Sequence, residues 1–342
     1  MRVAMAAVCL VVACHGGSEP ARRAAPEVRV DRRVEVMSIL QRLVGEREYV
    51  TAPHTAYVAD VDRAFAPFAN HPAVAATREL RRHGIVYDAP IQLAVQLDDS
   101  LALHTPLTDP RFAGIDTAAY LASVRDFAAA SHFDDFFAQH RAAYARMTAP
   151  LRDAIASENP APWFDAFFGA RPSAHFVTVA APLLGTWNYG PHAGDEIYEV
   201  MGIAKVDFDE RPVVDAEVLS LVVHELAHSY INPLLAAHRA ELEPSGERLF
   251  AAVRDQMTQQ SYGQWDIMLN ELAVRTVTTL YWHDRRGADA AAQMATAEVS
   301  RGFRALPQLV VLLQTKYEAD RTRYATLDAF MPELVRFLAT AN

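Results

Sequence analysis

The pentapeptide His224-Glu225-Leu226-Ala227-His228 constrains the fold of this chain more than any other stretch. In an α-helix, residues four apart lie almost above one another, so His224 and His228 would present ring nitrogens to one point. Two imidazoles arranged in this way supply half of the ligands of a tetrahedral zinc site. Glu225 would lie beside them, within reach of a water on the ion. The pattern therefore predicts a helix with one face turned to a metal.

The residues around this motif favour a buried helix. Asp215 is the predicted N-cap, and Glu217 lies in the first turn, where a negative charge suits the helix dipole. Residues 218–223 continue without Gly or Pro, and Pro233 is expected to end the helix. Because the helix is apolar almost all round, two histidines and a glutamate would be costly to bury without a metal. The alternative, a helix whose histidines are only hydrogen-bonded, is therefore the weaker interpretation.

A zinc site of this kind needs a third protein ligand and leaves its fourth position to water. Ile231 and Leu234 occupy the Gly and His positions of the longer pattern H-E-x-x-H-x-x-G-x-x-H, which argues against a metzincin. Glu271, 43 residues after the second histidine, is the preferred third ligand, in a segment predicted to be helical over about 265–282. Apolar neighbours would turn its carboxylate inward. The alternative is an ordinary surface pair between Glu271 and Arg275.

Two other side chains compete for the role of third ligand. His238 lies beyond Pro233 and is more typical of a surface histidine. Glu247 follows Pro244-Ser245-Gly246 and is expected near the start of a helix. Glu271 is preferred to both.

These residues carry a resemblance to a known class of enzymes. The motif H-E-x-x-H, followed some tens of residues later by Asn270-Glu271 on another helix, resembles the gluzincin metallopeptidases. The stretch HELAHSYINP also resembles a bacterial lipoprotein family of unknown function regarded as metallopeptidases, with weaker echoes at 70–74, 301–303 and 330–334. The likeness spans about 35–340, and its zinc motif is the specific part.

The resemblance implies a division of roles among the site residues. It implies that His224, His228 and Glu271 bind Zn²⁺ and that Glu225 is the general base. One departure stands out, because many gluzincins carry an acidic residue shortly after the ligand glutamate, as support for a histidine. This chain has Arg275 in that region, so the support is expected from elsewhere.

The N-terminus has the features of an export signal. A basic start is followed by ten apolar residues, too few to span a bilayer but typical of a signal-peptide core. The core ends in Val11-Val12-Ala13-Cys14, which looks like a bacterial lipobox. We therefore predict a signal peptide at 1–13, a lipidated Cys14, and a flexible tether over 14–32. A generic secretory signal with cleavage nearby is the alternative.

Composition limits the setting and the partners of the protein. Both cysteines lie in the predicted signal region, so the mature body has neither a disulfide nor a cysteine-based metal site. The net charge is −10 and there is no basic run, which argues against nucleic acid as a partner. No second stretch is long enough to span a membrane. We expect an exported protein of the bacterial cell envelope, lipid-anchored on a periplasmic or outer-surface face.

The body of the chain is predicted to be α+β and mainly α-helical. Residues 33–165 read as a helical N-terminal part, although 91–97 fit a strand or a helix. Residues 166–342 are predicted to form a zincin-like core, with a small sheet before the H-E-x-x-H helix. Its strands are expected at 175–180 and 197–208, separated by a turn-rich loop. The part of this loop at 187–190 would rim the active site or be an ordinary hairpin loop.

The chemistry that these residues can perform is hydrolysis. We predict a zinc metallopeptidase in which Glu225 activates the attacking water and the substrate is a peptide or protein. The oxyanion needs a further donor, and Tyr317 is preferred among the candidates by composition, which are Tyr262, Tyr281, His283, Tyr317 and Tyr324. The alternatives are a lipid-anchored, non-catalytic binding protein with a relic or structural zinc site, and a zinc hydrolase with another substrate. Structural zinc sites need four protein ligands, so Glu225 beside a three-ligand site argues for catalysis.

Overall fold

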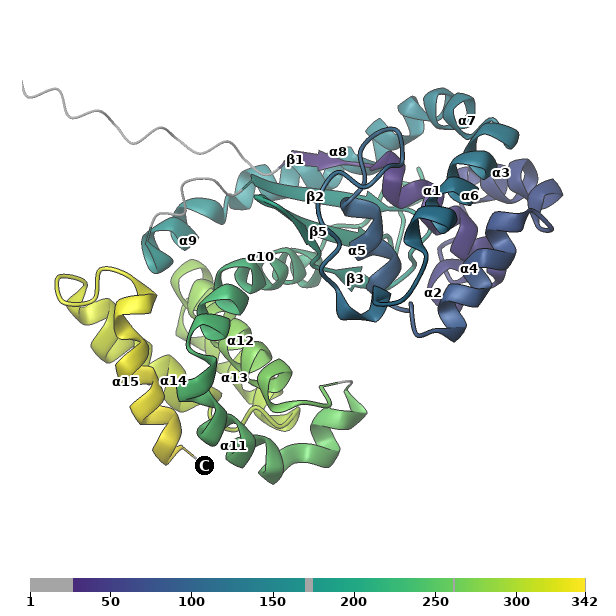
Figure 1. The fold of residues 1–342 in the computed structure, drawn as a ribbon. Helices are drawn as coiled ribbons and strands as arrows, with labels where there is room; N and C mark the ends of the chain where they lie inside the picture. Colours follow the sequence, from purple (N-terminus) through teal and green to yellow (C-terminus); the bar gives the residue numbers. More distant parts are fainter. Residues whose placement is uncertain (1–26, 170–174, 261, 342) are drawn as a thin grey trace, which may run out of the picture.

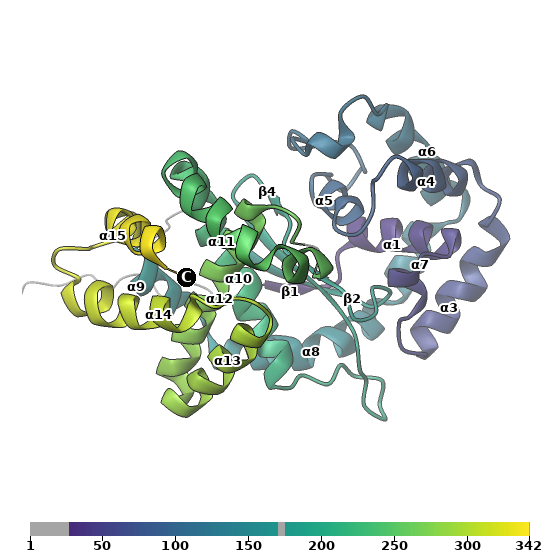
Figure 2. The same cartoon turned by 90° about the horizontal axis from the view of Figure 1, so that it is seen from below.

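A computed structural model describes residues 27–169, 175–260 and 262–341 of the chain. It is mainly helical with a small mixed sheet, which confirms the predicted α+β class. In both views the N-terminal helices and the C-terminal helices lie at opposite ends, with the sheet and helix α10 between them (Figure 1, Figure 2). The predicted signal peptide and Cys14 lie outside the described residues.

The N-terminal part consists of helices, as predicted. They are α1 (Arg32–Val44), α2 (Arg47–Val50), α3 (Ala56–Phe65), α4 (Pro72–Arg82), α5 (Ala89–Val95), α6 (Thr117–Ala130), α7 (Phe133–Gln139), α8 (Arg141–Glu158) and α9 (Ala161–Phe168). Short 3₁₀ turns lie at Ala66–Phe68 and Pro110–Phe112. The ambiguous segment 91–97 is therefore helical over most of its length, in α5.

The sheet has five short strands in the order β1-β2-β5-β3, and β4 also pairs with β5. The strands are β1 (Glu27–Arg29), β2 (His175–Ala181), β3 (Asn188–Tyr189), β4 (His192–Ala193) and β5 (Glu196–Gly202). The first two and β5 are parallel, whereas β3 and β4 run antiparallel along the outer edge of β5. Two sequence predictions need correction. The tether does not extend to residue 32, because β1 pairs with β2, and the strand predicted at 197–208 ends at Gly202.

The two faces of the sheet are buried against different partners. Along β5, Tyr198 and Val200 join the core formed with the N-terminal helices, whereas Ile197 joins the core formed with α10. Met201 packs against Val222 of α10. This alternation follows from the two-residue period of a strand, and it places Glu199, between Tyr198 and Val200, on the side of α10.

The C-terminal part packs against α10 (Ala216–Ala237), which also contacts β5 of the sheet. It consists of α11 (Arg239–Gln259), α12 (Trp265–Arg286), α13 (Ala288–Ser300), α14 (Leu306–Leu312) and α15 (Leu327–Thr340) (Figure 1). After α14 the chain continues in a π-helical turn at Leu313–Tyr317 and a 3₁₀ turn at Glu318–Asp320. None of the described helices combines the length and the apolar character needed to cross a bilayer.

The predicted end of the H-E-x-x-H helix was wrong, because α10 continues past Pro233 to Ala237. A proline inside a helix costs about 3 kcal/mol. The last turn of α10, however, buries Leu235 in the C-terminal core, and one such side chain contributes about 1.5–3 kcal/mol. Tertiary packing therefore offsets the local preference to stop.

The predicted boundary at 165/166 separates the two helical groups only approximately. One hydrophobic core joins α1–α8 to one face of the sheet, and the other joins α9–α15 to the opposite face. Phe164 of α9 already belongs to the second core. The sheet therefore serves both parts, and α10 lies where they meet.

Candidate metal centre

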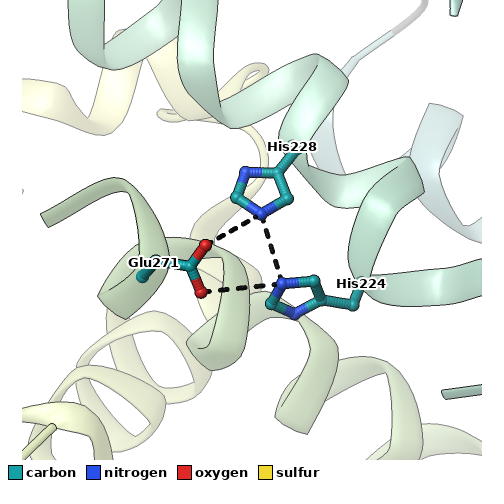
Figure 3. Close-up of side chains that lie close together, drawn as sticks. All are labelled: His224, His228 and Glu271. Carbon is teal, nitrogen blue, oxygen red and sulfur yellow. Dashed lines mark hydrogen bonds and ion pairs between the residues drawn. The ribbon is translucent and has the colours of Figure 1, made fainter. Parts of the chain in front are cut away.

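Two helices bring the candidate ligands together. Asp215 caps α10 as predicted, because its side chain accepts hydrogen bonds from the N–H groups of Glu217 and Val218. This fixes the start of the helix on which His224 and His228 lie one turn apart. Figure 3 shows both imidazoles directed toward Glu271, which comes from the neighbouring helix α12.

The spacing of the three side chains fits a tetrahedral ion. The Nε2 atoms of His224 and His228 are 3.2 Å apart. The carboxylate oxygens of Glu271 lie 3.2 Å from Nε2 of His228 and 3.6 Å from Nε2 of His224. With zinc–ligand bonds of about 2.0–2.2 Å, tetrahedral ligands are roughly 3.3–3.6 Å from one another. No other group of three such ligands occurs in the described part of the chain, so this is its single candidate centre.

Burial and charge decide where protons lie at this centre. Burial lowers the pKa of His224 to about 3, so its imidazole is neutral. Burial is also the largest single effect on His228 and acts in the same direction, but the hydrogen bond to Glu271 and the charges of Glu225 and Glu271 together outweigh it and raise the pKa of His228 to about 9. Burial alone would raise the pKa of Glu271, but His228 and His224 lower it to about 2. The metal-free centre therefore holds one shared proton, mainly on His228, and one carboxylate.

Neighbouring side chains hold the candidate ligands in place. The Nδ1 atom of His228 is 3.1 Å from the Oδ1 atom of Asn232, one turn further along α10. Arg275 donates to Glu271 at 3.1 Å and to Glu298 of α13 at 2.9 Å. The support that the sequence left open thus comes from Asn232 for the histidine and from Arg275 for the carboxylate. The Glu271–Arg275 pair does exist, but it is buried beside both histidines rather than lying on the surface.

Glu225 lies next to the outer edge of the sheet. A Cβ atom added to Gly190, in the two-residue break between β3 and β4, would be 2.5 Å from the Oε2 atom of Glu225. The loop predicted at 187–190 therefore reaches the site at its last residue. Burial raises the pKa of Glu225, which makes it a stronger base than an exposed glutamate.

Glu199 was not among the site residues predicted from the sequence. This residue of β5 is only 6% exposed, and neither of its carboxylate oxygens has a hydrogen-bond partner among the described residues. A signal was present, because a glutamate in the middle of the apolar strand IYEVMG must point to one of two buried faces. Which face it takes depends on strand pairing, which the sequence does not show.

The structure does not place Tyr317 where a substrate could meet it. Its ring is fully buried, and its hydroxyl donates to the backbone carbonyl of Phe167. The preference for Tyr317 as oxyanion donor therefore needs correction. Of the five candidates, Tyr262 lies beside the centre, where its hydroxyl accepts a hydrogen bond from Arg275 at 3.0 Å.

The two rejected ligands are elsewhere, as expected. The ring nitrogens of His238 contact Glu241 and Asp328. Glu247 is exposed within α11 rather than at the start of a helix, because α11 continues through Pro244. Neither belongs to the cluster around Glu271.

The centre opens onto a polar cavity. Its volume is about 300 Å³, and its walls include His224, Arg275, Thr278, Glu298 and Arg301. The candidate ligand His224 is therefore accessible from this cavity.

A comparison with protein families identifies the group to which this chain belongs. A family model described as "Domain of unknown function (DUF4932)" matches residues 27–337. The chain belongs to the DUF4932 family. The match contains the whole sheet, helices α1–α14 and every residue of the candidate centre, so the site is part of the DUF4932 domain. Comparisons with curated proteins and with solved structures found no significant match.

Proposed function

We propose that this DUF4932 protein is a zinc-dependent hydrolase, and specifically a gluzincin-like metallopeptidase with a zincin-like core. The observation that carries the proposal is the spacing of His224, His228 and Glu271, whose donor atoms all lie within 4.8 Å of one another. Glu225, on the same helix as the histidines, lies directly beside them in sequence. Three protein ligands and a neighbouring buried carboxylate are the set that catalytic zinc sites use.

The side chains would divide the work as follows. His224, His228 and Glu271 would hold the ion, and Asn232 and Arg275 would keep two of these ligands oriented. Bound zinc supplies a Lewis acid, which polarises the substrate carbonyl and makes water more acidic. Glu225 accepts a proton from the attacking water and delivers it to the leaving amine.

A peptide substrate is supported by the position of Glu225 at the sheet edge. Strand β3 is at the end of the described sheet, and Gly190 follows it against Glu225. An extended peptide can add to such an edge through backbone hydrogen bonds. Tyr262 is the candidate for the oxyanion donor, since its hydroxyl accepts from Arg275 and its own proton can be donated to a substrate oxygen.

We further propose that the protein is exported and lipid-anchored at Cys14. The basis is the sequence alone, where an apolar core ends in Val-Val-Ala-Cys. One acyl chain anchors only weakly, so the mature residue should carry more than one. Mass spectrometry that finds an unmodified N-terminus further along the chain would exclude this anchor.

The substitution Glu225→Gln tests the catalytic proposal. Glutamine keeps the size of the side chain but cannot accept a proton, while all three ligands remain. Turnover should fall by ~10²–10⁴-fold at unchanged zinc content, measured with a diverse peptide library. Equal cleavage by both proteins would remove Glu225 from the mechanism. No cleavage by the zinc-loaded wild type would instead favour the non-catalytic, lipid-anchored binding protein.

A further inference from the structure

A second, mainly apolar cavity lies between the sheet and the first turns of α10. Its volume is about 260 Å³. Three of its residues form one row across the sheet, because Ala180 pairs with Met201 and Met201 pairs with Asn188. Side chains in one row point to the same face, here the face covered by α10. Leu151 of α8 and Val218 of α10 complete the apolar walls.

This apolar cavity adjoins the cavity at the metal centre. Glu217 and Leu221 line both cavities, and His224 lines the second. These residues are spaced by four and three positions, so they share one face of α10. A molecule bound at His224 can therefore extend along α10 into the apolar cavity.

The edge of the sheet gives the distance between the apolar cavity and Glu225. Asn188 lines the apolar cavity, and Gly190 lies against Glu225. The two residues are two positions apart, or about 7 Å at the rise of a strand. A peptide added to this edge would have one residue level with Gly190 and the residue two positions along level with Asn188. Both side chains would face α10.

We propose that the 260 Å³ cavity binds a large apolar side chain of the substrate, two residues from the scissile bond. This inference rests on the proposed peptidase function and names its substrate class, which is peptides with a residue such as Leu, Met or Phe at that position. The direction in which the peptide pairs with the edge determines whether this residue lies before or after the scissile bond.

The test observes binding without turnover. In zinc-loaded Glu225→Gln protein with ¹³C-methyl methionine, the methyl signal of Met201, assigned with Met201→Leu, reports on the cavity. N-acetyl-leucine amide should shift this signal, whereas N-acetyl-glutamate amide should not. Equal shifts, or none, would overturn the proposal even if the protein proves to be a peptidase.

Two matched variants locate the effect. Ala204 is exposed and lines the cavity, whereas Ala216 is exposed nearby and does not. Ala204→Trp should weaken leucine-probe binding by roughly tenfold or more, the scale of losing one buried aliphatic side chain. Ala216→Trp should leave it unchanged. In the active protein, Ala204→Trp should likewise lose the preference of the peptide library for an apolar residue.

The carboxyl of Glu199 is buried and has no hydrogen-bond partner among the described residues. Strand pairing joins Tyr189 to Val200 and His192 to Ile197, and this register places Gly190 opposite Glu199. Side chains in such cross-strand positions are about 5 Å apart at Cβ. Glu225 occupies the space where Gly190 has no side chain, so its carboxyl lies beside that of Glu199. Both carboxyls also line one cavity of about 10 Å³, close to the volume of a single water.

We propose that Glu199 is protonated and donates a hydrogen bond to Glu225, directly or through one water, so that it is a positioning residue for the general base. Glu199 is only 6% exposed, and its carboxyl has no hydrogen-bond partner among the described residues. A buried carboxylate without a cation or a donor beside it is costly, so these surroundings favour the neutral, protonated form of Glu199. A protonated carboxyl has one hydrogen to donate, and the carboxyl of Glu225 is the acceptor that the strand register brings beside it.

Infrared spectroscopy tests this proposal without an activity assay. The carbonyl band of a protonated carboxyl should be present at neutral pH, disappear in Glu199→Gln and move in Glu225→Gln. Absence of such a band would overturn the proposal. An activity readout then separates positioning from packing. Glu199→Gln keeps a donor and should retain turnover, whereas Glu199→Leu should lose roughly tenfold or more at unchanged zinc affinity. Equal activity of these two variants would reduce Glu199 to a packing role.

Discussion

The substitution Gly190→Ala probes the general base from a residue that has no chemistry of its own. The added Cβ atom would be 2.5 Å from the Oε2 atom of Glu225, where ordinary contact begins at about 3.4 Å. The carboxyl must therefore move by about 0.9 Å, the difference of these two distances. Gly190 is not among the residues with positive φ, so alanine fits its backbone. The change acts on the position of Glu225 alone.

The expected result is a selective loss of turnover. The atom in the way is the end of a flexible side chain, so folding and zinc content should be close to wild type. A displacement of about 1 Å at a reacting group can cost ~10²-fold in rate, and complete loss of a general base costs ~10²–10⁴-fold. We therefore expect Gly190→Ala to lose roughly two orders of magnitude in kcat on peptides, at full zinc occupancy.

A double-mutant cycle checks the cause. If alanine acts through Glu225, the variant that combines Gly190→Ala with Glu225→Gln should be no slower than Glu225→Gln alone. Additive losses would mean that Gly190 affects substrate binding or the sheet edge instead. Wild-type turnover by a correctly folded Gly190→Ala protein would refute the placement of Glu225 against Gly190.

Three further predictions concern the metal. Loss of a residue that only supports a metal ligand typically weakens metal affinity by ~10–100-fold. Glu271→Ala should weaken zinc affinity by more than this, as measured with a competing chelator. Undiminished affinity would exclude Glu271 as a ligand. Asn232→Ala should fall within that ~10–100-fold range, because Asn232 only orients His228. Below pH 9, zinc binding should release about one proton, since His228 has a pKa of about 9 in the metal-free centre and must bind zinc as the neutral imidazole. Calorimetry in two buffers of different ionisation enthalpy measures this release, and zinc affinity should rise with pH until about pH 9.

Local spacing made the clustering of the candidate ligands predictable from the sequence. The helical period places His224 and His228 together whatever the rest of the chain does, and the cap at Asp215 is a local hydrogen-bond pattern. Glu271 was predictable because an acidic residue among leucines and valines on a buried helix needs a partner. The end of α10 was not predictable, because the cost of Pro233 is local whereas the burial of Leu235 depends on distant helices.

The candidate oxyanion donor could not be predicted from the sequence. Tyr262 and Tyr317 have the same chemistry, and nothing in their neighbouring residues separates them. The fold separates them, since one hydroxyl lies beside Arg275 at the centre and the other is buried against the carbonyl of Phe167. Side-chain chemistry can be read from a sequence, but the distance to a site formed by other segments cannot.

The same limit explains why Glu199 was not predicted as a site residue and why Gly190 was predicted only as the last residue of a loop at the rim of the site. A single register across β3, β4 and β5 places Gly190 opposite Glu199. Because Gly190 has no side chain, the carboxyl of Glu225 on α10 fits beside Glu199. A slip of one residue would turn Glu199 to the opposite face, toward the N-terminal helices. The environment of the general base therefore depends on strand pairing as much as on the H-E-x-x-H helix. Substitutions that shift the edge strand should impair Glu225 while leaving the three candidate zinc ligands on α10 and α12 intact.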